Sequence, residues 1–390
     1  MLFQSISPLT ALTVVLVLSS TVLAGNYTLR DEITGRQFLD RFWFWFYNDP
    51  THGTVNYVDQ FTAIANRLAY VNSNNHFVIR ADNTSVVPPG RGRQSVRMHS
   101  KRTVGDGIIV GKFSFMPQGC ATWPAFWTCT NGNWPTGGEI DIVEGANDQG
   151  PRNLASLHTL YGCHIPSGSR SDQLGITSQT DCSYQPGCSA SFTADNSFGP
   201  NFNRNGGGYF AVRRETRPGD RGIGVYFWPI TSSPSSLPSA VAALSDGVSA
   251  PKYVVTNSNA TGNDRSELNK WGTPSAFFAN TANSSATPAS LAGDGSVCEM
   301  NKFFDEHTII INLSLCGDWA GETFALSGCA ARYNNLSCDN FVRNYPQAFS
   351  DARWEINYMR IYDNAASLKG RPAAMFYWML SVLVMGYLFT

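Results

Sequence analysis

Hydrophobic and polar residues alternate along this chain in short runs that turn-forming residues separate. The alternation has a period of two, as in the run SVRMH at 95–99, which is typical of strands with one buried face. Gly, Asn, Pro and Ser fill the gaps, and neither an internal repeat nor a long helical period is present. The runs that predict strands are 54–58, 76–81, 95–100, 108–116, 139–144, 209–214, 224–228, 307–315 and 353–362.

This succession of short strands predicts an all-β fold, a sandwich or jelly roll in one domain, rather than an α/β fold. Three connections are long, at 162–205, 231–250 and 257–296. Connections of such length in a compact domain are usually functional, so we expect them to border a binding site. A linker between two domains is the alternative for 231–251, but the strand-like runs on both sides favour an inserted loop.

Both ends of the chain carry processing signals. Residues 9–23 are almost wholly apolar or small and lead to Ala24 and Gly25, so we expect 1–24 to be a signal peptide, with a membrane anchor as the alternative. Small residues at 364–366, a polar spacer and an uncharged tail have the layout of a glycolipid (GPI) anchor signal. The sequence thus predicts a single domain over 25–364, lipid attachment at Asn364, and a C-terminal propeptide at 365–390.

Composition and modification patterns agree with secretion. The net charge is −1, which excludes the basic face that nucleic-acid binding needs. The nine cysteines form no C-x-x-C pair, which argues against zinc; in an oxidising compartment they predict up to four disulfides with one cysteine left over. We expect a monomeric glycoprotein at the cell surface or wall, lipid-anchored to the outer plasma membrane. The predicted glycosylation sites are Asn26, Asn83, Asn259, Asn283 and Asn335; Asn312 also matches the pattern, but its apolar surroundings make it the least credible acceptor.

The strand-like run EIDIVE holds three carboxylates among Ile and Val. Residues two apart share a face of a strand, so Glu139 and Asp141 point the same way, whereas Glu144 would point the other way. A β-bulge at 142–143 adds one residue and returns Glu144 to the acidic face. Ile140 and one of the two bulge residues would then fill the core side.

Three acids on one face repel one another, so their grouping suggests chemistry. Retaining glycosidases need two carboxyl groups about 5 to 5.5 Å apart, one as nucleophile and one as acid/base. Asp141 between them can hydrogen-bond the nucleophile and separate the two pKa values. The alternatives are a solvated strand face or a structural calcium site with three carboxylates. We expect no catalytic metal and no cofactor.

Tryptophans precede this acidic run, at Trp123, Trp127 and Trp134. Aromatic side chains provide flat apolar area of the kind that the C–H faces of sugar rings contact. Trp134 lies in a Gly- and Asn-rich loop and is expected to be exposed, whereas core packing is the alternative for one of the other two. The combination of acids and tryptophans predicts a polysaccharide site.

The segment 123–145, WPAFWTCTNGNWPTGGEIDIVEG, resembles the active-site region of glycoside hydrolase family 16. Its E-x-D-x-x-E spacing is similar to the bulged form of the fungal endo-1,3(4)-β-glucanase (laminarinase-type) branch. Lichenases and cell-wall transglycosylases have the shorter E-x-D-x-E form. Further blocks resemble the family in its order, so the likeness covers essentially the whole mature chain: DPTHG at 49–53, GRQSVR at 92–97, CGDWAG at 316–321 and WEIN at 354–357.

The resemblance implies a β-jelly roll of two antiparallel sheets with a concave glucan cleft. It implies that Glu139 is the nucleophile, Glu144 the acid/base and Asp141 the assisting carboxylate. It also implies that substrate is bound by Trp127, Trp134, His158 and, more loosely because the basic residue usual after the following proline is absent, Trp228. A histidine hydrogen-bonded inside the sheet is the alternative for His158.

The main prediction is therefore a retaining endo-β-glucanase acting on β-1,3- or mixed β-1,3/1,4-glucan. A transglycosylase that remodels wall glucan would share the glycosyl-enzyme intermediate, but the bulged motif argues against it. A non-catalytic, lectin-like glucan-binding protein would have no reason to keep both Glu139 and Glu144.

Overall fold

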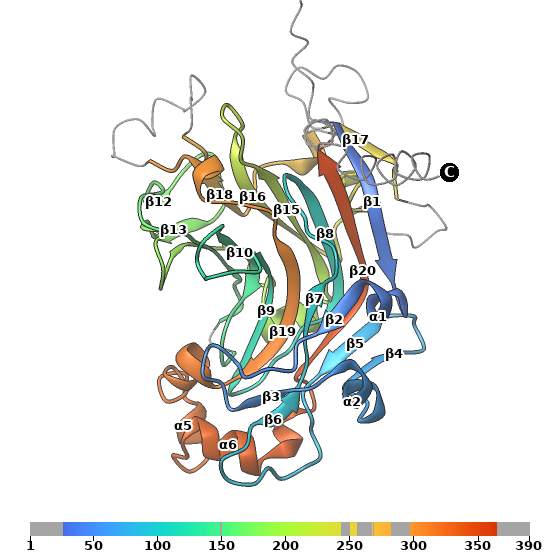
Figure 1. Ribbon diagram of the computed structural model, residues 1–390, viewed down its shortest axis with the longest axis vertical. Coiled ribbons are helices and arrows are strands. Elements are labelled where there is room, and N and C mark those ends of the chain that lie inside the picture. Colours follow the sequence, from blue (N-terminus) through green and yellow to red (C-terminus); the bar gives the residue numbers. More distant parts are fainter. Residues whose placement is uncertain are drawn as a thin grey trace, which may run out of the picture.

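A computed structural model of the protein describes residues 26–148, 150–242, 250–255, 267, 269–281 and 297–364. The predicted signal peptide, the propeptide at 365–390, Asn259 and Asn283 lie outside these residues. Two large antiparallel sheets stack face to face in the described part, with few helices (Figure 1). This arrangement confirms the predicted all-β sandwich.

The first sheet holds nine described strands, with β20 near its middle. Along the main path the order is β17 (Tyr253–Val255), β1 (Asn26–Thr34), β20 (Arg353–Asn364), β8 (Gly107–Phe115), β15 (Gly208–Glu215), β16 (Gly222–Pro229) and β18 (Ala276–Ala279). Two further strands branch from β20: β5 (Phe77–Arg80), which pairs with it, and β4 (Ala69–Val71), which pairs with β5.

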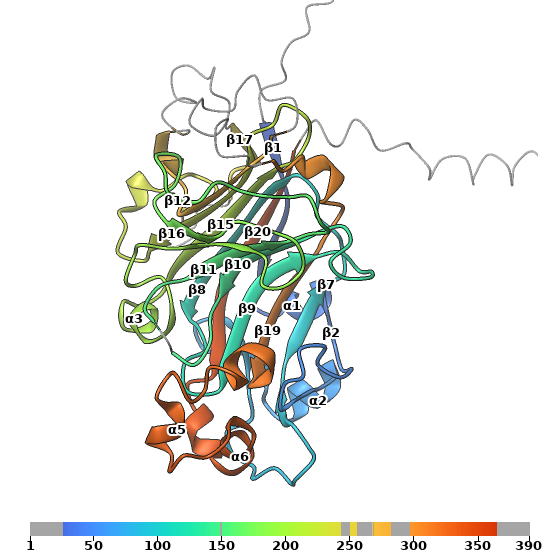
Figure 2. The same ribbon diagram turned by 90° about the vertical axis from the view of Figure 1, so that its left-hand side faces the viewer.

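The second sheet also holds nine described strands, and Figure 2 faces it. Their order is β12 (Gly168–Ser169), β13 (Ile176–Gln179), β14 (Cys188–Ser191), β11 (Leu154–His158), β10 (Glu139–Glu144), β9 (Thr122–Cys129), β19 (Thr308–Leu315), β7 (Arg97–Ser100) and β2 (Phe42–Phe44). The strand β10, which carries the three predicted acids, therefore lies in the interior of this sheet.

Short elements close the ends of the sandwich. A small parallel pair joins β3 (Val55–Tyr57) to β6 (Arg93–Ser95). The α-helices are α1 (Gln37–Arg41), α2 (Gln60–Ala65), α3 (Gly199–Arg204), α5 (Cys329–Arg332) and α6 (Cys338–Asn344). The remaining helical turns are η1 (Pro234–Ser236), η2 (Met300–Lys302), η3 (Gly317–Gly321) and η4 (Pro346–Phe349).

All nine predicted strands are present, within a few residues of the predicted bounds. The central strand β9 was not among them, because its sequence TWPAFWTC contains a proline, which removes a ladder donor. In the structure, Pro124 lies one residue beyond the last pair between β9 and β10, which is Ala125 with Glu144. Pro124 therefore pairs with β19 alone. The predicted loop 162–205 is wrong in part, since β12, β13, β14 and α3 lie within it; those strands are only two to four residues long.

The core lies between the two sheets, and alternation along each strand decides which residues enter it. On β19, Ile309 and Ile311 join the core cluster, while Ile310 points to the other face of the second sheet. On β16, Phe227 packs against the core, whereas Trp228 packs against a second cluster on the outer face of the first sheet. Residues 237–241 and Trp271 cover that outer face.

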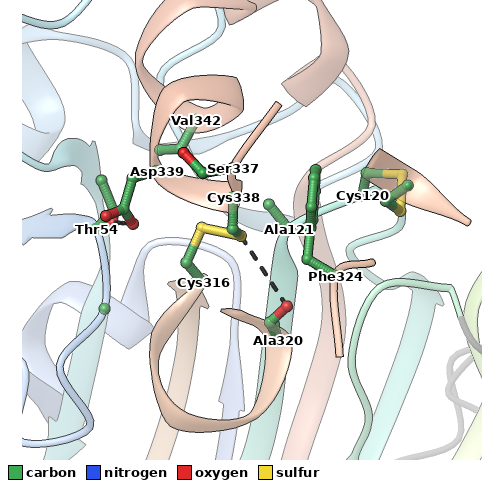
Figure 3. Close-up of a disulfide and its surroundings, with 12 residues drawn as sticks. Thr54, Cys120, Ala121, Cys316, Ala320, Phe324, Ser337, Cys338, Asp339 and Val342 are labelled. Atoms are coloured by element: carbon green, nitrogen blue, oxygen red, sulfur yellow. Dashed lines mark hydrogen bonds between the residues drawn. A yellow bond between two sulfur atoms is a disulfide. The ribbon is translucent and has the colours of Figure 1, made fainter. Parts of the chain in front are cut away.

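Four disulfides and one free cysteine, Cys129, confirm the count expected from the sequence. Cys120–Cys329 and Cys316–Cys338 fasten α5 and α6 to the ends of β9 and β19. Figure 3 shows Cys316–Cys338 beneath α6, with Cys338 Sγ directed at the carbonyl oxygen of Ala320. The helical end of the molecule is thus covalently joined to the second sheet.

The modification sites predicted within the described residues stay predictions, and the structure places them as follows. Asn335 is exposed, Asn83 is half-buried, and Asn26 opens β1. Asn364 ends β20 with 3 % of its surface exposed, and Asn312 is buried in β19, in keeping with its low credibility as an acceptor. No helix among the described residues combines the length and apolar character that crossing a membrane requires.

We expect removal of the Cys316–Cys338 bond in a Cys316→Ser/Cys338→Ser variant to lower the free energy of unfolding by about 3 kcal/mol, because the bond restricts the unfolded chain between two cysteines that are 22 residues apart. Urea unfolding at neutral pH measures the change. Cys129→Ser, which breaks no disulfide, is the matched control and should change stability by well under half as much. Equal effects in both variants would show that the bond does not stabilise the helical end.

Candidate active site

The acidic residues of β10 lie on the face of the second sheet that turns away from the core. Glu139 pairs with Cys129 of β9 and with His158 of β11, and Asp141 pairs with Trp127. The register then shifts by one residue on both sides of β10 before Glu144. This shift is the β-bulge that the spacing of the acids predicts, and it brings Glu144 to the face of Glu139 and Asp141.

The bulge buries more than the sequence suggested. We expected only one of Ile142 and Val143 on the core side, but both belong to the core cluster and neither has exposed surface. A bulge sets two residues of one strand against a single residue of its neighbour, so two successive side chains can face the same way. The site is therefore backed by three apolar residues of β10, including Ile140.

Asn153, the residue before β11, holds the bulge in place. Its Oδ1 accepts the backbone N–H of Glu144 at 3.0 Å, and its Nδ2 donates to the carbonyl oxygen of Ile142 at 2.8 Å. The side chain is fully buried, and its own backbone N–H donates to Ser197 Oγ at 2.9 Å. A side-chain amide thus replaces the ladder hydrogen bonds that the extra residue disrupts.

Each glutamate of the site accepts a hydrogen bond from its own tryptophan. Trp134 Nε1 donates to Glu139 Oε2 at 3.0 Å, and Trp123 Nε1 donates to Glu144 Oε1 at 2.9 Å. Trp134 is 42 % exposed, as its loop predicts. His307 anchors that loop from below, since its Nε2 lies 2.8 Å from the carbonyl oxygen of Gly137.

His158 lies beside two of the acids. Its Nε2 is 3.2 Å from Asp141 Oδ2 and 3.8 Å from Glu139 Oε1, while its Nδ1 lies 2.7 Å from the carbonyl oxygen of Tyr184. The contact with Asp141 is close but poorly aligned, so that Oδ2 has no well-aligned hydrogen-bond donor among the described residues. The carbonyl contact requires a proton on Nδ1, and a second proton on Nε2 would face the carboxylates.

The electrostatics of this cluster favour a charged histidine and a proton shared among the acids. Burial alone lowers the pKa of His158, but Asp141 and Glu139 outweigh burial and raise that pKa to about 10. Burial and the charge of Asp141 raise the pKa of Glu139 to about 8, and they raise that of Glu144 to about 8 as well. Of the two glutamates, Glu139 is the one that lies within 4 Å of His158, and the positive charge of His158 lowers the pKa of Glu139 against the effects of burial and Asp141.

The structure brings together all predicted site residues but one. Trp127, the neighbour of Asp141 on β9, is half-buried and donates from Nε1 to Asn312 Oδ1 at 2.7 Å. Trp228 lies in the first sheet, stacked on Tyr226 and edge-on to Trp271, and is not brought to this site. A residue next to it, Phe227, takes the core-facing position instead.

Metal binding is a weak alternative for this cluster. Glu139, Asp141 and His158 are the single group of three potential ligands among the described residues. Calcium prefers oxygen ligands, and one of these three groups is an imidazole. The calcium site considered from the sequence stays without support from this geometry.

Sequence reasoning missed Asn153, Arg97 as a contact of Trp127, and the carbonyl of Tyr184. No motif marks Asn153, and a backbone carbonyl has no sequence signature. Arg97 was visible in a family-like block, and the structure places its guanidinium 5.0 Å from the ring centre of Trp127. As a chemical assembly, the site offers two glutamates with raised pKa values, a histidine beside one of them, and an aromatic wall.

The family model of the XgeA-like, catalytic GH16 domain matches residues 42–362 of this chain. An endo-1,3(4)-β-glucanase of Arthroderma benhamiae is 33 % identical over 88 % of this chain and 66 % of its own length. A probable glycosidase of Schizosaccharomyces pombe is 33 % identical over 87 % of this chain and 70 % of its own. Other relatives are longer: the chain spans 43 % of the length of a probable endo-1,3(4)-β-glucanase of Aspergillus niger, to which it is 33 % identical over 92 % of its own length. The chain thus spans between 43 % and 70 % of the length of the curated relatives that it matches.

Solved structures resemble the protein along most of its length. Laminarinase 16A of Phanerochaete chrysosporium, solved with 6-O-glucosyl-laminaritriose in donor and acceptor sites, is 38 % identical with a TM-score of 0.72. The likeness covers 87 % of this chain and 100 % of that one. An elongating GH16 β-1,3-glucosyltransferase is 31 % identical with a TM-score of 0.68, over 86 % of this chain and 99 % of that one.

We expect Asn153→Ala to lower the free energy of unfolding by about 2 kcal/mol or more, since two buried backbone groups lose their partner. The loosened bulge should also let Glu144 reach water, so its pKa should fall toward the ordinary value. Urea unfolding and a carbon-13 NMR titration of the glutamate carboxyl groups measure the two effects. Ser197→Ala, which removes only the acceptor of the Asn153 N–H, is the control and should leave the titration of Glu144 in place; an unchanged titration in Asn153→Ala would contradict this role.

Proposed function

Because the chain belongs to glycoside hydrolase family 16, we propose that it is a retaining endo-β-glucanase that cleaves β-1,3- or mixed β-1,3/1,4-glucan. The observation that carries this proposal is the bulged acidic face of β10. It holds Glu139 and Glu144 on one side of the sheet, each with its own indole donor, and Asp141 with His158 beside them. Two carboxyl groups with separate environments are what a double displacement uses.

We assign Glu139 as the nucleophile. The imidazolium of His158 lies 3.8 Å from Glu139 and, together with the Trp134 N–H, stabilises the Glu139 carboxylate against the effects of burial and Asp141, as a nucleophile requires. Its carboxylate oxygen would attack the anomeric carbon and form a glycosyl ester, while the bond to the leaving oxygen breaks. Asp141, next along the same face, keeps His158 charged and oriented toward that carboxylate.

Glu144 is assigned as the acid/base. Burial and the negative charge of Asp141 raise the pKa of Glu144, so Glu144 keeps its proton at neutral pH and can give it to the leaving oxygen. In the second step its carboxylate takes a proton from water, which attacks the ester from the opposite side and releases the sugar with retained configuration. The Trp123 N–H holds the carboxyl in place through both steps.

The β-glucan substrate is supported by the relatives, by the laminarinase solved with its glucans, and by the aromatic wall of the site. Trp134 presents an exposed ring next to Glu139, and Trp127 lies beside Asp141. Such faces suit the C–H surfaces of glucosyl units and would flank the cleaved bond.

Transfer to a second sugar is the alternative outcome of the same intermediate, and the likeness to the elongating β-1,3-glucosyltransferase favours considering it. The two functions differ only in the acceptor of the second step. Product analysis on an oligosaccharide of laminarin separates the two functions. Hydrolysis gives only shorter chains, whereas transfer gives chains longer than the starting oligosaccharide.

We expect Glu139→Ala to abolish hydrolysis and added azide to restore turnover, because azide enters the space of the missing carboxylate, attacks the anomeric carbon as the leaving oxygen departs, and gives a glycosyl azide of inverted configuration. Glu144→Ala should still react with substrates whose leaving group needs no proton, and azide should then give a retained adduct. Proton NMR of the first-formed product gives the stereochemistry. Inverted configuration in the wild-type reaction would show that the two carboxyl groups do not act as nucleophile and acid.

We expect two matched variants to move opposite limbs of the pH profile of kcat/KM. Trp123→Phe removes a hydrogen bond that lowers the pKa of Glu144; the pKa rises, and because Glu144 must be protonated, the alkaline limb moves to higher pH. Trp134→Phe likewise raises the pKa of Glu139; because Glu139 must be ionised, the acid limb moves to higher pH.

The wild-type profile measured on the same substrate is the reference for both variants. If each variant moved the limb assigned to the other, the roles of Glu139 and Glu144 would have to be exchanged.

A further inference from the structure

A histidine on the core side of the second sheet contacts the loop that carries Trp134. His307, the residue before β19, is fully buried, and Thr128, in the interior of β9, is nearly so. Thr128 pairs with Ile140 and Ile309, which both face the core, so its side chain lies on the side of the sheet opposite the acids. The proposed chemistry uses neither Thr128 nor His307.

Three hydrogen-bonding groups form a chain from the core side of the sheet to the loop. Thr128 Oγ1 lies 2.9 Å from His307 Nδ1, and His307 Nε2 lies 2.8 Å from the carbonyl oxygen of Gly137. A carbonyl oxygen can only accept, so the proton of a neutral ring is on Nε2, and Nδ1 must accept from the Thr128 hydroxyl. The hydroxyl group thus selects the tautomer of His307 that donates to the loop.

The surroundings keep this histidine neutral. Burial and the guanidinium of Arg214 lower the pKa of His307 well below its usual range. Arg214 Nη2 also donates to the carbonyl oxygen of Asp305 at 2.6 Å, and the backbone N–H of Asp305 donates to the carbonyl oxygen of Gly137 at 3.0 Å. The Gly137 carbonyl therefore accepts two hydrogen bonds from the segment that leads into β19, and one of them depends on a single ring tautomer.

The loop connects the Gly137 carbonyl to the indole of Trp134. The backbone N–H of Gly138 donates to the carbonyl oxygen of Pro135 at 3.0 Å, which closes a turn around Gly137. Gly137 has a left-handed φ of 81°, a conformation that favours glycine. Trp134, the residue before this turn, donates from Nε1 to Glu139 Oε2 at 3.0 Å. A shift of the Gly137 carbonyl would therefore move the indole relative to the carboxyl group.

We propose that His307 is a positioning residue for the glucanase reaction. With its tautomer set by Thr128, the ring holds the carbonyl group of Gly137 in place. The turn around that carbonyl then keeps the indole of Trp134 on the carboxyl group of Glu139. The proposal rests on the proposed function and deepens it, since the hydrogen bond to the nucleophile depends on two buried residues on the core side of the sheet.

The test compares two substitutions of Thr128 in the full chain. Thr128→Val removes the hydroxyl group but keeps the volume, whereas Thr128→Ser keeps the hydroxyl group but removes the methyl group. In Thr128→Val the ring has no donor at Nδ1, so the tautomer with its proton on Nδ1 becomes populated and turns a lone pair toward Gly137. Nitrogen-15 NMR of the six histidine rings should show this change for His307, whose signals His307→Gln identifies. Thr128→Ser should keep the wild-type tautomer.

The pH profile of kcat/KM on laminarin measures the functional consequence. A looser Trp134 indole raises the pKa of Glu139, which must be ionised, so the acid limb should move to higher pH in Thr128→Val. On the acid side kcat/KM should fall about threefold, the factor that a rise of the pKa by about 0.5 produces, while the alkaline limb stays in place. Thr128→Ser should keep the wild-type profile, whereas a merely structural effect would appear in this variant too, since it loses packing.

If Thr128→Val does not fold, His307→Gln and His307→Leu replace it. The Gln amide can still donate to the Gly137 carbonyl, so His307→Leu should move the acid limb and His307→Gln should not. An unchanged tautomer or acid limb in Thr128→Val would overturn the positioning role, as would equal shifts in Thr128→Val and Thr128→Ser.

A wild type that does not cleave laminarin would contradict the glucanase proposal instead. The indole N–H signal of Trp134 in proton NMR then decides on the positioning role without turnover. It should shift in Thr128→Val and stay in place in Thr128→Ser; an unshifted signal in Thr128→Val would overturn the role.

Discussion

One extra residue in β10 is the constraint on which the site depends. In a regular strand Glu144 would enter the apolar core beside Ile140, where an unpaired carboxylate is costly to bury. The bulge turns Ile142 and Val143 inward together, so that the acid reaches the face of Glu139. The register of both neighbouring strands shifts to accept it, and the amide of Asn153 pairs the backbone groups that the shift leaves open.

The bulge places three carboxyl groups on one face, and the neighbouring groups stabilise their negative charges to different extents. Three carboxyl groups on one face repel, and burial further disfavours their charged forms, so some of them must remain protonated. His158, a cation in contact with the acids, lies 3.8 Å from Glu139, whereas Glu144 accepts the indole N–H of Trp123. The same arrangement that limits repulsion therefore gives the two glutamates different neighbours.

The sequence predicted the parts of this structure that local patterns encode. Alternation identified the nine longer strands, and the E-x-D-x-x-E spacing required the bulge because only an added residue places Glu144 with the other acids. Patterns failed where tertiary context decides: Pro124 concealed β9, and β12 to β14 are too short to show a period. Trp228 was assigned to the cleft from the family resemblance alone, and alternation could not correct this, because it cannot say which face of a strand the other sheet covers. Asn153 was missed because its role depends on a partner strand rather than on its neighbours in sequence.

The disulfides of the connection at 162–205 link this long segment to the orientation of His158 in the site. His158 keeps its orientation by contact with the carbonyl oxygen of Tyr184, which lies inside the small loop closed by Cys182–Cys188. Cys163–Cys298 ties the same connection to the segment that follows the first-sheet strand β18, and the backbone N–H of Cys182 donates to the carbonyl oxygen of Cys163. A carbonyl on an untethered loop would hold the imidazolium ring less firmly in one direction. The orientation of the positive charge of His158 beside Glu139 therefore depends, through Tyr184, on disulfides. Disulfides form and persist in oxidising compartments.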